Sequence, residues 1–226
     1  MTLSNSREKV LNRVRASLGR AAPASGRERD QAEAYMREHL RGPQPMAEID
    51  LVAAFEGQSR RLSATIDRIS SIDDLPGAVA TYLGKEGLPS RAVCWPAYAG
   101  LQWTNSGLSV EARAPSRDLM QDLVGITGCF AAVAETGTLA MYSGKDSPAS
   151  MSLLPETHIA VVPVGRIVPH MEDVFELIRA ERVMMPRALS FISGPSRTAD
   201  IEQTIVLGAH GPYRVHLILL ENPTHD

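Results

Sequence analysis

The sequence predicts an α/β fold in which a largely parallel sheet is flanked by helices. From about residue 46 onwards, short apolar runs with strand character alternate with segments in which apolar residues recur at helical spacing. This alternation is typical of a parallel sheet, because parallel neighbours need a crossover connection between them. Apolar residues make up 44% of the 226-residue chain, which is enough for a substantial core.

The first 45 residues are expected to form a helical extension that precedes a single domain at residues 46–226. Residues 4–18 show helical spacing, residues 21–26 have the composition of a linker, and residues 27–40 resemble a second, polar helix. The extension contains nine Lys and Arg against five Asp and Glu, a net charge of +4, whereas the domain contains fourteen against twenty-one, a net charge of −7. The first helix has an apolar face that predicts contact with a partner subunit or a second copy of the chain, and it consists of Val10, Leu11, Val14 and Leu18.

Within the domain, the spacing of apolar residues predicts each element in turn. Helical spacing predicts helices at residues 47–61, 72–86, 170–182 and 199–207. Short apolar or alternating runs predict strands at residues 62–66, 92–95, 157–163, 189–192 and 216–220. Two further apolar runs, 126–134 and 139–142, are separated by a polar turn.

Composition and charge argue against several classes of function. The net charge of −3 gives no global basic field, so nucleic-acid binding is not expected. Cys94 and Cys129 form no CxxC pair and cannot complete a four-ligand set, so this chain alone is expected to hold no iron–sulfur cluster and no structural zinc. The N-terminus lacks the apolar region of a signal peptide, and no apolar run approaches the ~20 residues of a membrane span. A cytoplasmic protein with reduced thiols is therefore expected.

The first candidate site is the polar turn between the two apolar runs, formed by Glu135, Thr136, Gly137 and Thr138. A glutamate between an alanine and a glycine turn is expected to be partly desolvated, and desolvated carboxyl groups serve in acid–base and nucleophilic catalysis. The threonines supply hydroxyl groups, and the glycine permits close backbone approach. A glutamate that only caps the turn through backbone N–H groups is the structural alternative.

The second candidate site is a Gly-rich turn between the predicted strand at 189–192 and the predicted helix at 199–207. In such a turn, backbone N–H groups can face a ligand, and an arginine can bind a carboxylate or phosphate with two parallel hydrogen bonds. Asp200 could accept from a ligand hydroxyl or hold a metal, or it could pair with Arg197 and simply order the turn. The candidate ligand-binding residues are Gly194, Pro195, Ser196, Arg197, Thr198, which is also a helix N-cap candidate, and Asp200.

The histidines show no spacing that indicates a metal site, and none is predicted. His158 and His216 lie in predicted strands and are expected to belong to the core or a sheet face. His210 follows the predicted helix at 199–207 between glycines, so a role in ligand binding and a favourable interaction with the helix dipole are both open. The sequence contains no GxSxG motif for a serine hydrolase.

Three motifs closely resemble the lactate utilization protein C family, whose domain is called LUD and was formerly DUF162. They are AETGTL at residues 134–139, SLLPETHIAVVP at 152–163 and GPSRTADIEQTIVLGAHGP at 194–212. The resemblance covers about residues 46–220. It implies a fold like that of sugar-phosphate isomerases and CoA transferases. It also implies work beside an iron–sulfur protein and a cysteine-rich protein in oxidising L-lactate to pyruvate without soluble NAD.

The sequence therefore predicts a non-redox subunit of a lactate-oxidising complex, in which the two candidate sites converge on one cleft that binds a small anionic ligand or a cofactor of unknown identity. The alternatives are an independent isomerase, ligase or acyl-transfer enzyme that uses Glu135 as its catalytic residue, and a scaffold without catalysis. In related CoA transferases a glutamate forms a covalent adduct, and its transfer to Glu135 is an analogy of fold. The resemblance leaves the chemical role of the subunit, its ligand and any homo-oligomer open.

Overall fold

A computed structural model of the protein describes residues 3–19, 25–48, 50–116, 122–181, 186–198, 206–208 and 210–221. The chain divides into two compact units, Met1–Gln44 and Pro45–Asp226. In the described part of the chain, no helix is both long and apolar enough to cross a membrane.

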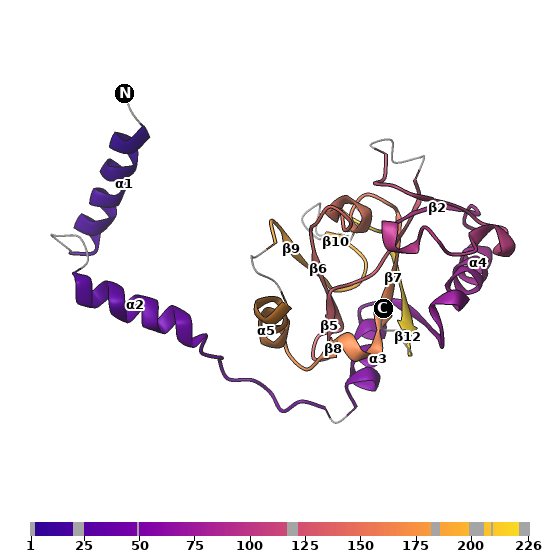
Figure 1. Ribbon diagram of the computed structural model, residues 1–226, viewed down its shortest axis with the longest axis horizontal. Coiled ribbons are helices and arrows are strands. Elements are labelled where there is room, and N and C mark those ends of the chain that lie inside the picture. The colour runs from indigo at the N-terminus through magenta and orange to yellow at the C-terminus, as the bar shows by residue number, and fades with distance from the viewer. Residues whose placement is uncertain are drawn as a thin grey trace. The chain divides into compact units, whose positions relative to one another are not determined.

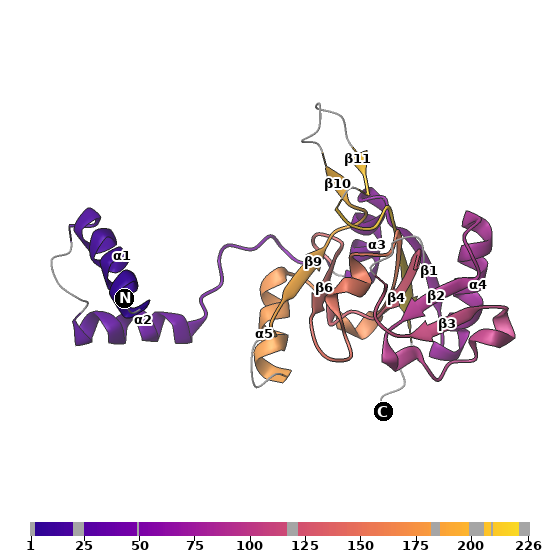
Figure 2. The ribbon, with the colours of Figure 1, turned by 90° about the horizontal axis from the view of Figure 1, so that it is seen from above.

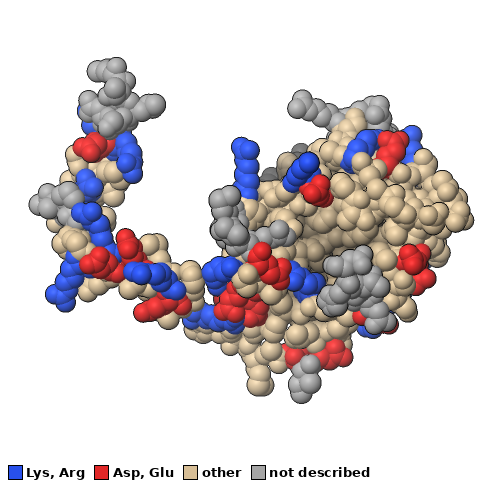
Figure 3. Space-filling model, in the orientation of Figure 1, with Lys and Arg blue, Asp and Glu red and all other residues tan. Residues whose placement is uncertain are grey.

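The N-terminal unit contains two helices, α1 (Leu3–Ser17) and α2 (Gly26–Glu38). Ser25 begins α2 with a capping box, in which its hydroxyl accepts from the backbone of Glu28 and the Glu28 carboxylate accepts from the backbone of Ser25. Basic and acidic side chains alternate over the visible surface of this unit (Figure 3). The predicted apolar face of α1 is exposed, at Val10, Leu11, Val14 and Leu18.

The main sheet of the second unit has six strands in the order β1-β12-β7-β4-β2-β3, and every neighbouring pair is parallel. This confirms the predicted α/β class and the largely parallel sheet. The strand β7 lies inside the sheet and is buried over nearly its whole length (Figure 1). The strands are β1 (Thr65–Ile69), β2 (Arg91–Cys94), β3 (Ser109–Ala112), β4 (Val124–Thr127), β7 (Thr157–Pro163) and β12 (Arg214–Leu220).

A second, mixed sheet of four strands in the order β8-β5-β6-β9 packs against the main sheet and was not predicted. The pair β5–β8 is parallel, whereas β5–β6 and β6–β9 are antiparallel. Alternate residues of β5 face opposite layers, because Ala132 packs toward the main sheet and Ala131 toward α5. The strands are β5 (Ala131–Val133), β6 (Thr138–Tyr142), β8 (Ile167–Val168) and β9 (Leu189–Ile192).

Three helices of the second unit cover the sheets. The helix α4 (Leu75–Glu86) packs Leu75, Val79 and Leu83 on one face of the main sheet, and α5 (Met171–Glu181) packs on the outer face of the mixed sheet, on the opposite side of the domain (Figures 1 and 2). The helix α3 (Leu51–Arg61) buries Phe55 in the cluster between the two sheets. Short 3₁₀ segments are η1 (Ile72–Asp74), η2 (Pro96–Tyr98), η3 (Trp103–Ser106), η4 (Ala149–Ser152) and η5 (Val164–Arg166).

The predicted helix at 199–207 is wrong at its C-terminal end. Val206–Leu207 form a strand, β11, which pairs antiparallel with β10 (Arg197–Thr198), and this ladder stands at one end of the domain (Figure 2). Residues 199–205 lie outside the described residues. Thr198 lies in β10. The predicted helix that it would cap begins at residue 199, outside the described residues. His210 therefore follows a strand, and the helix-dipole interpretation of this residue is also wrong.

Candidate functional site

Glu135 and His170 are brought together by the parallel register of β5 and β8. Val133 pairs with Val168, and the ladder continues beyond the strands, because the Ala134 N–H donates to Val168 O at 2.8 Å and the Glu135 N–H donates to Pro169 O at 3.1 Å. Parallel strands in register place side chains of the same direction next to each other. The Nδ1 atom of His170 consequently lies 2.9 Å from Oε2 of Glu135.

The two members of this pair differ in burial. The side chain of His170 is only 9% exposed, whereas that of Glu135 is 38% exposed and so less buried than its sequence context suggested. His170 directly precedes α5, and its backbone N–H donates to the Asp173 carboxylate at 2.8 Å. The histidine is thus fixed by the start of the helix, while the glutamate stays accessible from outside.

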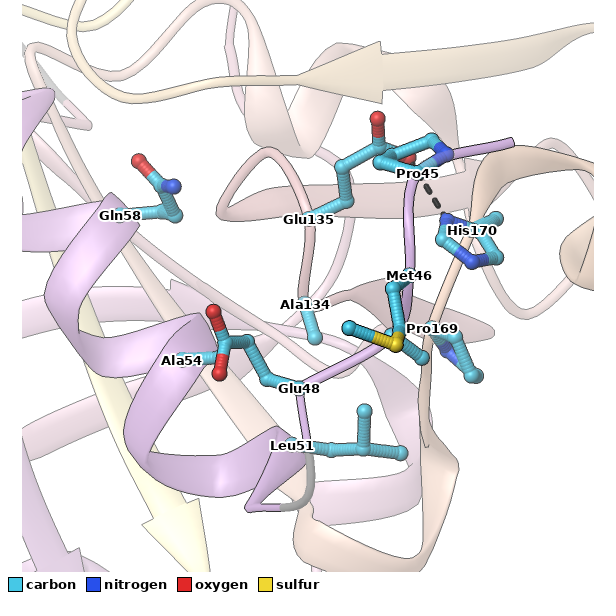
Figure 4. Close-up of a pocket in the computed structure, with 11 residues that line it drawn as sticks. Pro45, Met46, Glu48, Leu51, Ala54, Gln58, Ala134, Glu135, Pro169 and His170 are labelled. Atoms are coloured by element: carbon cyan, nitrogen blue, oxygen red, sulfur yellow. Dashed lines mark hydrogen bonds and ion pairs between the residues drawn. The ribbon is translucent and has the colours of Figure 1, made fainter. Parts of the chain in front are cut away.

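A cavity of about 160 Å³ lies beside the pair and belongs entirely to the second unit. Figure 4 shows residues 45–48, here called the strap, passing between α3 and the segment that carries His170. The rest of the wall is mainly apolar. The described lining residues are Pro45, Met46, Ala47 and Glu48 of the strap, Leu51, Ala54 and Gln58 of α3, and Ala134, Glu135, Pro169 and His170.

The described wall of this cavity is acidic. Glu48 and Glu135 contribute two carboxylates, and no Lys or Arg is among the described lining residues. Arg61 lines a neighbouring open groove on α3, together with Glu48 and Asp50, and its guanidinium donates to Gln58 Oε1 at 3.4 Å. Among the described lining residues, His170 is therefore the one side chain that can carry a positive charge toward a carboxylate ligand.

The two predicted site stretches do meet, although not for the expected reason. The strand β9 runs antiparallel to β6, so the end of β9 lies beside the start of β6. Hydroxyl groups link the two stretches, because Thr138 Oγ1 lies 2.8 Å from Thr136 Oγ1 and 2.7 Å from Ser193 Oγ. The meeting point is on the mixed sheet rather than at the carboxyl edge of the main sheet.

The glycines of both stretches hold the end of α3. Gly137 has a φ of +63°, and a Cβ at this position would lie 2.6 Å from the Ser59 backbone nitrogen. Gly194 has a φ of +75°, and a Cβ there would lie 2.5 Å from the Leu62 carbonyl oxygen. Both positions require glycine, because of their positive φ and because a Cβ would overlap the α3 backbone. The glycines therefore allow the end of α3 to pack closely against the mixed sheet.

Arg197 does not line the cavity described above. Its Nη2 donates to Leu62 O and to Ser63 Oγ, at the corner between α3 and β1. Ser63 itself has a φ of +69°, an uncommon conformation for a residue with a side chain. Arg197 thus stabilises the strained backbone between α3 and β1 through these hydrogen bonds. Asp200, the alternative partner considered for Arg197, lies outside the described residues.

The remaining residues of the second stretch have backbone roles in the structure. The Ser196 N–H donates to Pro212 O at 2.9 Å, and the Gly208 N–H donates to Ser196 O at 3.0 Å, which joins the stretch to the start of β12. Pro195 is half-buried beside Gly194, and His210 is exposed. None of the residues named in this paragraph lines the cavity beside Glu135.

His158 and His216 are core residues, as predicted. His158 is fully buried with its Nε2 2.7 Å from Thr127 Oγ1, and burial lowers the pKa of His158 to about 4. His216 stacks on the Tyr82 ring at 3.9 Å between centroids, and burial likewise lowers the pKa of His216 to about 4. Neither histidine reaches the cavity.

The cysteines have the chemistry of inert thiols. Burial raises the pKa of Cys94 to about 11 and that of Cys129 to about 12, so both are protonated at neutral pH. Within the described ranges, no three His, Cys, Asp or Glu side chains are grouped as a metal site.

Comparison with known proteins identifies the family. The family model of the LUD domain matches residues 74–220, and lactate utilization protein C of Bacillus licheniformis is 30% identical over 91% of this chain and 95% of its own length. The chain belongs to the LUD domain family. Lactate utilization protein C of an Exiguobacterium species is also 30% identical, with 98% of each chain covered. These matches confirm the family that the three motifs indicated.

A solved LUD structure supports the same assignment. The crystal structure of a DUF162 family protein from Deinococcus radiodurans is 26% identical and has a TM-score of 0.56, covering 78% of this chain and 99% of that chain. The residues matched by the LUD model include Glu135 and His170, whereas the strap and α3 precede them. The cavity is therefore built by the LUD domain together with the segment in front of it.

Among the described residues at the cavity, His170 is one that the sequence did not single out. It was visible only as one of several histidines without metal spacing. Its position before an amphipathic helix with Asp173 three residues later is a recognisable helix start. Its contact with Glu135 depends on the β5–β8 register, which no local pattern of residues specifies.

Proposed function

We propose that the chain is a component of an L-lactate-oxidising system and that the cavity beside Glu135 and His170 is its ligand site. The relatives that cover nearly all of the chain are named for lactate utilization. This site is chosen because His170, which is largely buried, and Glu135, which is accessible, lie in contact at the cavity wall, with 2.9 Å between Nδ1 and Oε2. Such pairs are the usual means of moving a proton in an active site.

The geometry suits a proton acceptor. An ionised carboxylate can only accept, so Nδ1 of His170 carries the hydrogen in the contact with Glu135. The Nε2 atom then has a free lone pair, and the carboxylate stabilises the imidazolium that forms when Nε2 takes up a proton. Oxidation of a 2-hydroxy acid to a 2-oxo acid removes the hydroxyl proton and, from the carbon that bears the hydroxyl group, a second proton together with an electron pair. The electron pair and this second proton are proposed to pass to a cofactor of a partner protein. In this proposal the Glu135–His170 pair takes the hydroxyl proton, through Nε2 of His170.

The electrons are proposed to leave through partners. The family resemblance pairs this subunit with an iron–sulfur protein and a cysteine-rich protein, and transfer of an electron pair requires a cofactor. The contribution of this chain is to hold and deprotonate the ligand. The proposed setting is the cytoplasm.

Covalent catalysis by Glu135 is the second candidate, because this carboxylate is accessible at 38% exposure. The hydrogen bond from His170 favours the acid–base role over the covalent one, since it stabilises the carboxylate and makes it a weaker nucleophile. Turnover of an acyl donor by the isolated chain, with a mass adduct on Glu135, would establish the covalent role instead.

The proposed role is tested by deleting the gene and measuring growth on L-lactate and on pyruvate as sole carbon sources. The expected result is loss of growth on lactate alone, with full restoration by the wild-type gene. Undiminished growth of the deletion strain on lactate would refute the role, provided that no second gene of this family is present. Loss of growth on both carbon sources would also refute it, because pyruvate lies beyond the proposed step.

A further inference from the structure

We infer that Gln58 recognises the carboxylate of the ligand, which its side-chain Nε2 binds while His170 takes the hydroxyl group. This inference rests on the proposed function, in which the cavity beside Glu135 and His170 holds a 2-hydroxy acid. It adds a residue that determines specificity, and it assigns an orientation to the bound ligand. Gln58 lines this cavity from α3 and is half-buried.

The described wall offers few side chains that can donate a hydrogen bond to a carboxylate. Its glutamates only accept when they are ionised, and apart from Gln58 and His170 the other lining side chains are apolar. In the proposed function, Nε2 of His170 accepts the hydroxyl proton while Nδ1 donates to Glu135, so neither ring nitrogen is left to donate to the carboxylate. The amide of Gln58 is the remaining side-chain donor among the described lining residues.

The amide of Gln58 is oriented by Arg61, which follows it three residues later on α3. The guanidinium of Arg61 donates from Nη1 to Gln58 Oε1 at 3.4 Å. Because a guanidinium can only donate, the amide oxygen must face Arg61, and this orientation leaves the N–H groups of Nε2 for another partner. The positive charge behind the amide also polarises it and strengthens donation from Nε2. At 3.4 Å this hydrogen bond is long, so Arg61 is expected to contribute less to binding than Gln58 itself.

The position of Gln58 at the cavity follows from its place on α3 and from Gly137. Leu51, Ala54 and Gln58 are spaced at i, i+3 and i+7, so one face of the helix lines the cavity. The turn that carries Glu135 lies directly against this face, because a Cβ at Gly137 would come within 2.9 Å of Gln58 Cβ. The glycine of this turn therefore allows Gln58 and Glu135 to share one wall.

A small 2-hydroxy acid fits between Gln58 and His170. In the view of Figure 4, Glu135 lies between these two residues. With the hydroxyl group at His170 and the carboxylate at Gln58, the short carbon chain of the ligand faces the apolar part of the wall. The cavity holds about 160 Å³, and ~150 Å³ is enough for a molecule of the size of benzene. This orientation also places the negative charge of the ligand toward Arg61, which lines the neighbouring groove.

L-lactate and (S)-1,2-propanediol form a matched pair of probes. They share the hydroxyl group, the methyl group and the configuration, and the diol has a CH₂OH group in place of the carboxylate. Binding to the full-length chain is measured by an NMR titration with ¹³C-labelled methionine methyl groups, in which the signal of Met46 reports on the cavity that it lines. The wild type is expected to bind L-lactate roughly tenfold more tightly than the diol, because a hydrogen bond to a charged acceptor is the stronger one.

Two substitutions remove the amide donor and keep the length of the side chain. Gln58→Met has an apolar side chain, and Gln58→Glu has nearly the same shape as glutamine but only accepts when it is ionised. Methionine and glutamate both favour helices, so α3 is expected to persist in both variants. Each should weaken L-lactate binding roughly tenfold and reduce the preference for L-lactate over the diol. A merely structural role of Gln58 would weaken the binding of both probes equally and leave the preference unchanged.

Arg60→Met and Glu181→Gln are the controls. Arg60 is an exposed residue of α3 that does not line the cavity, and its substitution lowers the net charge by one, as Gln58→Glu does. Glu181→Gln raises the net charge by one. Glu181 pairs with Arg166 away from the cavity, and its exposure of 39% is similar to the 38% of Glu135. Both controls should keep the wild-type affinity for each probe.

Three results would overturn the inference: no binding of L-lactate to the wild type, equal or tighter binding of the diol, and an unchanged preference in the Gln58 variants. These outcomes are separate from those of the growth test. Loss of growth on lactate after gene deletion, combined with an unchanged preference in the Gln58 variants, would support the proposed function and refute the role of Gln58. Binding of L-lactate that depends on Gln58, in a chain that is dispensable for growth on lactate, would do the reverse.

Discussion

Nδ1 of His170 lies 2.9 Å from Oε2 of Glu135, and the two residues stand side by side because β5 and β8 are parallel and in register. The glutamate comes from the turn between β5 and β6, and the histidine from the residue before α5. Two backbone hydrogen bonds beyond the strand ends, from Ala134 and Glu135, fix the register up to the pair itself. The geometry thus depends on the sheet rather than on mobile side chains.

The glycines of the two motif stretches are predicted to be structural. Gly137→Ala and Gly194→Ala should each lower the free energy of unfolding by more than about 2 kcal/mol, because the positive φ alone costs ~1–2 kcal/mol and the new Cβ would overlap Ser59 N or Leu62 O. Gly84→Ala is the matched control. It lies in α4 with open space around it, and it should raise the stability by ~0.5–1 kcal/mol. Urea denaturation measures all three, and wild-type stability in both motif variants would contradict the prediction.

The buried His158 predicts a loss of stability in mild acid. Its pKa is about 4 in the folded chain and ~6.5 in the unfolded chain, so between these values the unfolded state binds more protons. Stability should therefore be fully present above pH ~6.5 and fall by up to about 3 kcal/mol as the pH drops to ~4. His158→Gln, whose amide can still bond Thr127, should show a shallower fall in denaturation curves recorded from pH 7 to pH 4. A parallel fall in both proteins would count against this account.

The exposed apolar face of α1 predicts a contact with another protein chain. Val14→Asp places a charge in the centre of this face and should weaken complex assembly or self-association, while leaving the stability of the second unit unchanged. Asn12→Asp adds the same charge at an exposed position outside the apolar face and should have no such effect. Sedimentation velocity, with and without the partner proteins, measures the assembly. Identical behaviour of the two variants would show that the apolar face makes no contact.

Arg197 is predicted to act through the α3–β1 corner. Loss of its hydrogen bonds to Leu62 and Ser63 in Arg197→Ala should cost ~1 kcal/mol of stability. Growth on lactate should then fall only in proportion to the amount of folded protein, since Arg197 does not line the cavity. Arg197→Lys should recover part of the stability, because an ammonium can still donate to Ser63 but lacks the planar fork. Abolished growth with normal levels of folded Arg197→Ala would restore the anion-clamp role that the sequence suggested.

The sequence predicted the elements whose periodicity is strong. The strands β7 and β9 have the predicted bounds, and each end of α5 lies within one residue of its predicted position. The apolar run of β7 and the helical stripe of α5 leave few alternatives there. The family followed from motif residues that the comparisons confirm. Local sequence patterns failed to predict secondary structure where pairing between separate strands determines it. The run at 199–207 reads as a helix, but its end pairs with Arg197–Thr198 in a ladder.

The candidate site was only partly visible in the sequence for the same reason. Glu135 was recognised from its turn, and it lines the cavity. His170 comes from a segment that is far away in the sequence and adjacent only through the β5–β8 register. Glu48 was not recognised, because the strap has no periodic pattern that marks it as part of a wall. The balance of charge in the cavity follows from these two residues, so the sequence alone could not predict it.

The most direct test of the proposed site is the rate of L-lactate consumption by cells whose only copy of the gene encodes Glu135→Gln, normalised to the amount of folded protein. Removal of the carboxylate leaves His170 in place but takes away the group that stabilises its protonated form. The account predicts a rate at least ~100-fold below wild type, a typical loss for general acid–base catalysis, and a wild-type rate for the control Glu181→Gln. A wild-type rate in Glu135→Gln would contradict the assignment of the site.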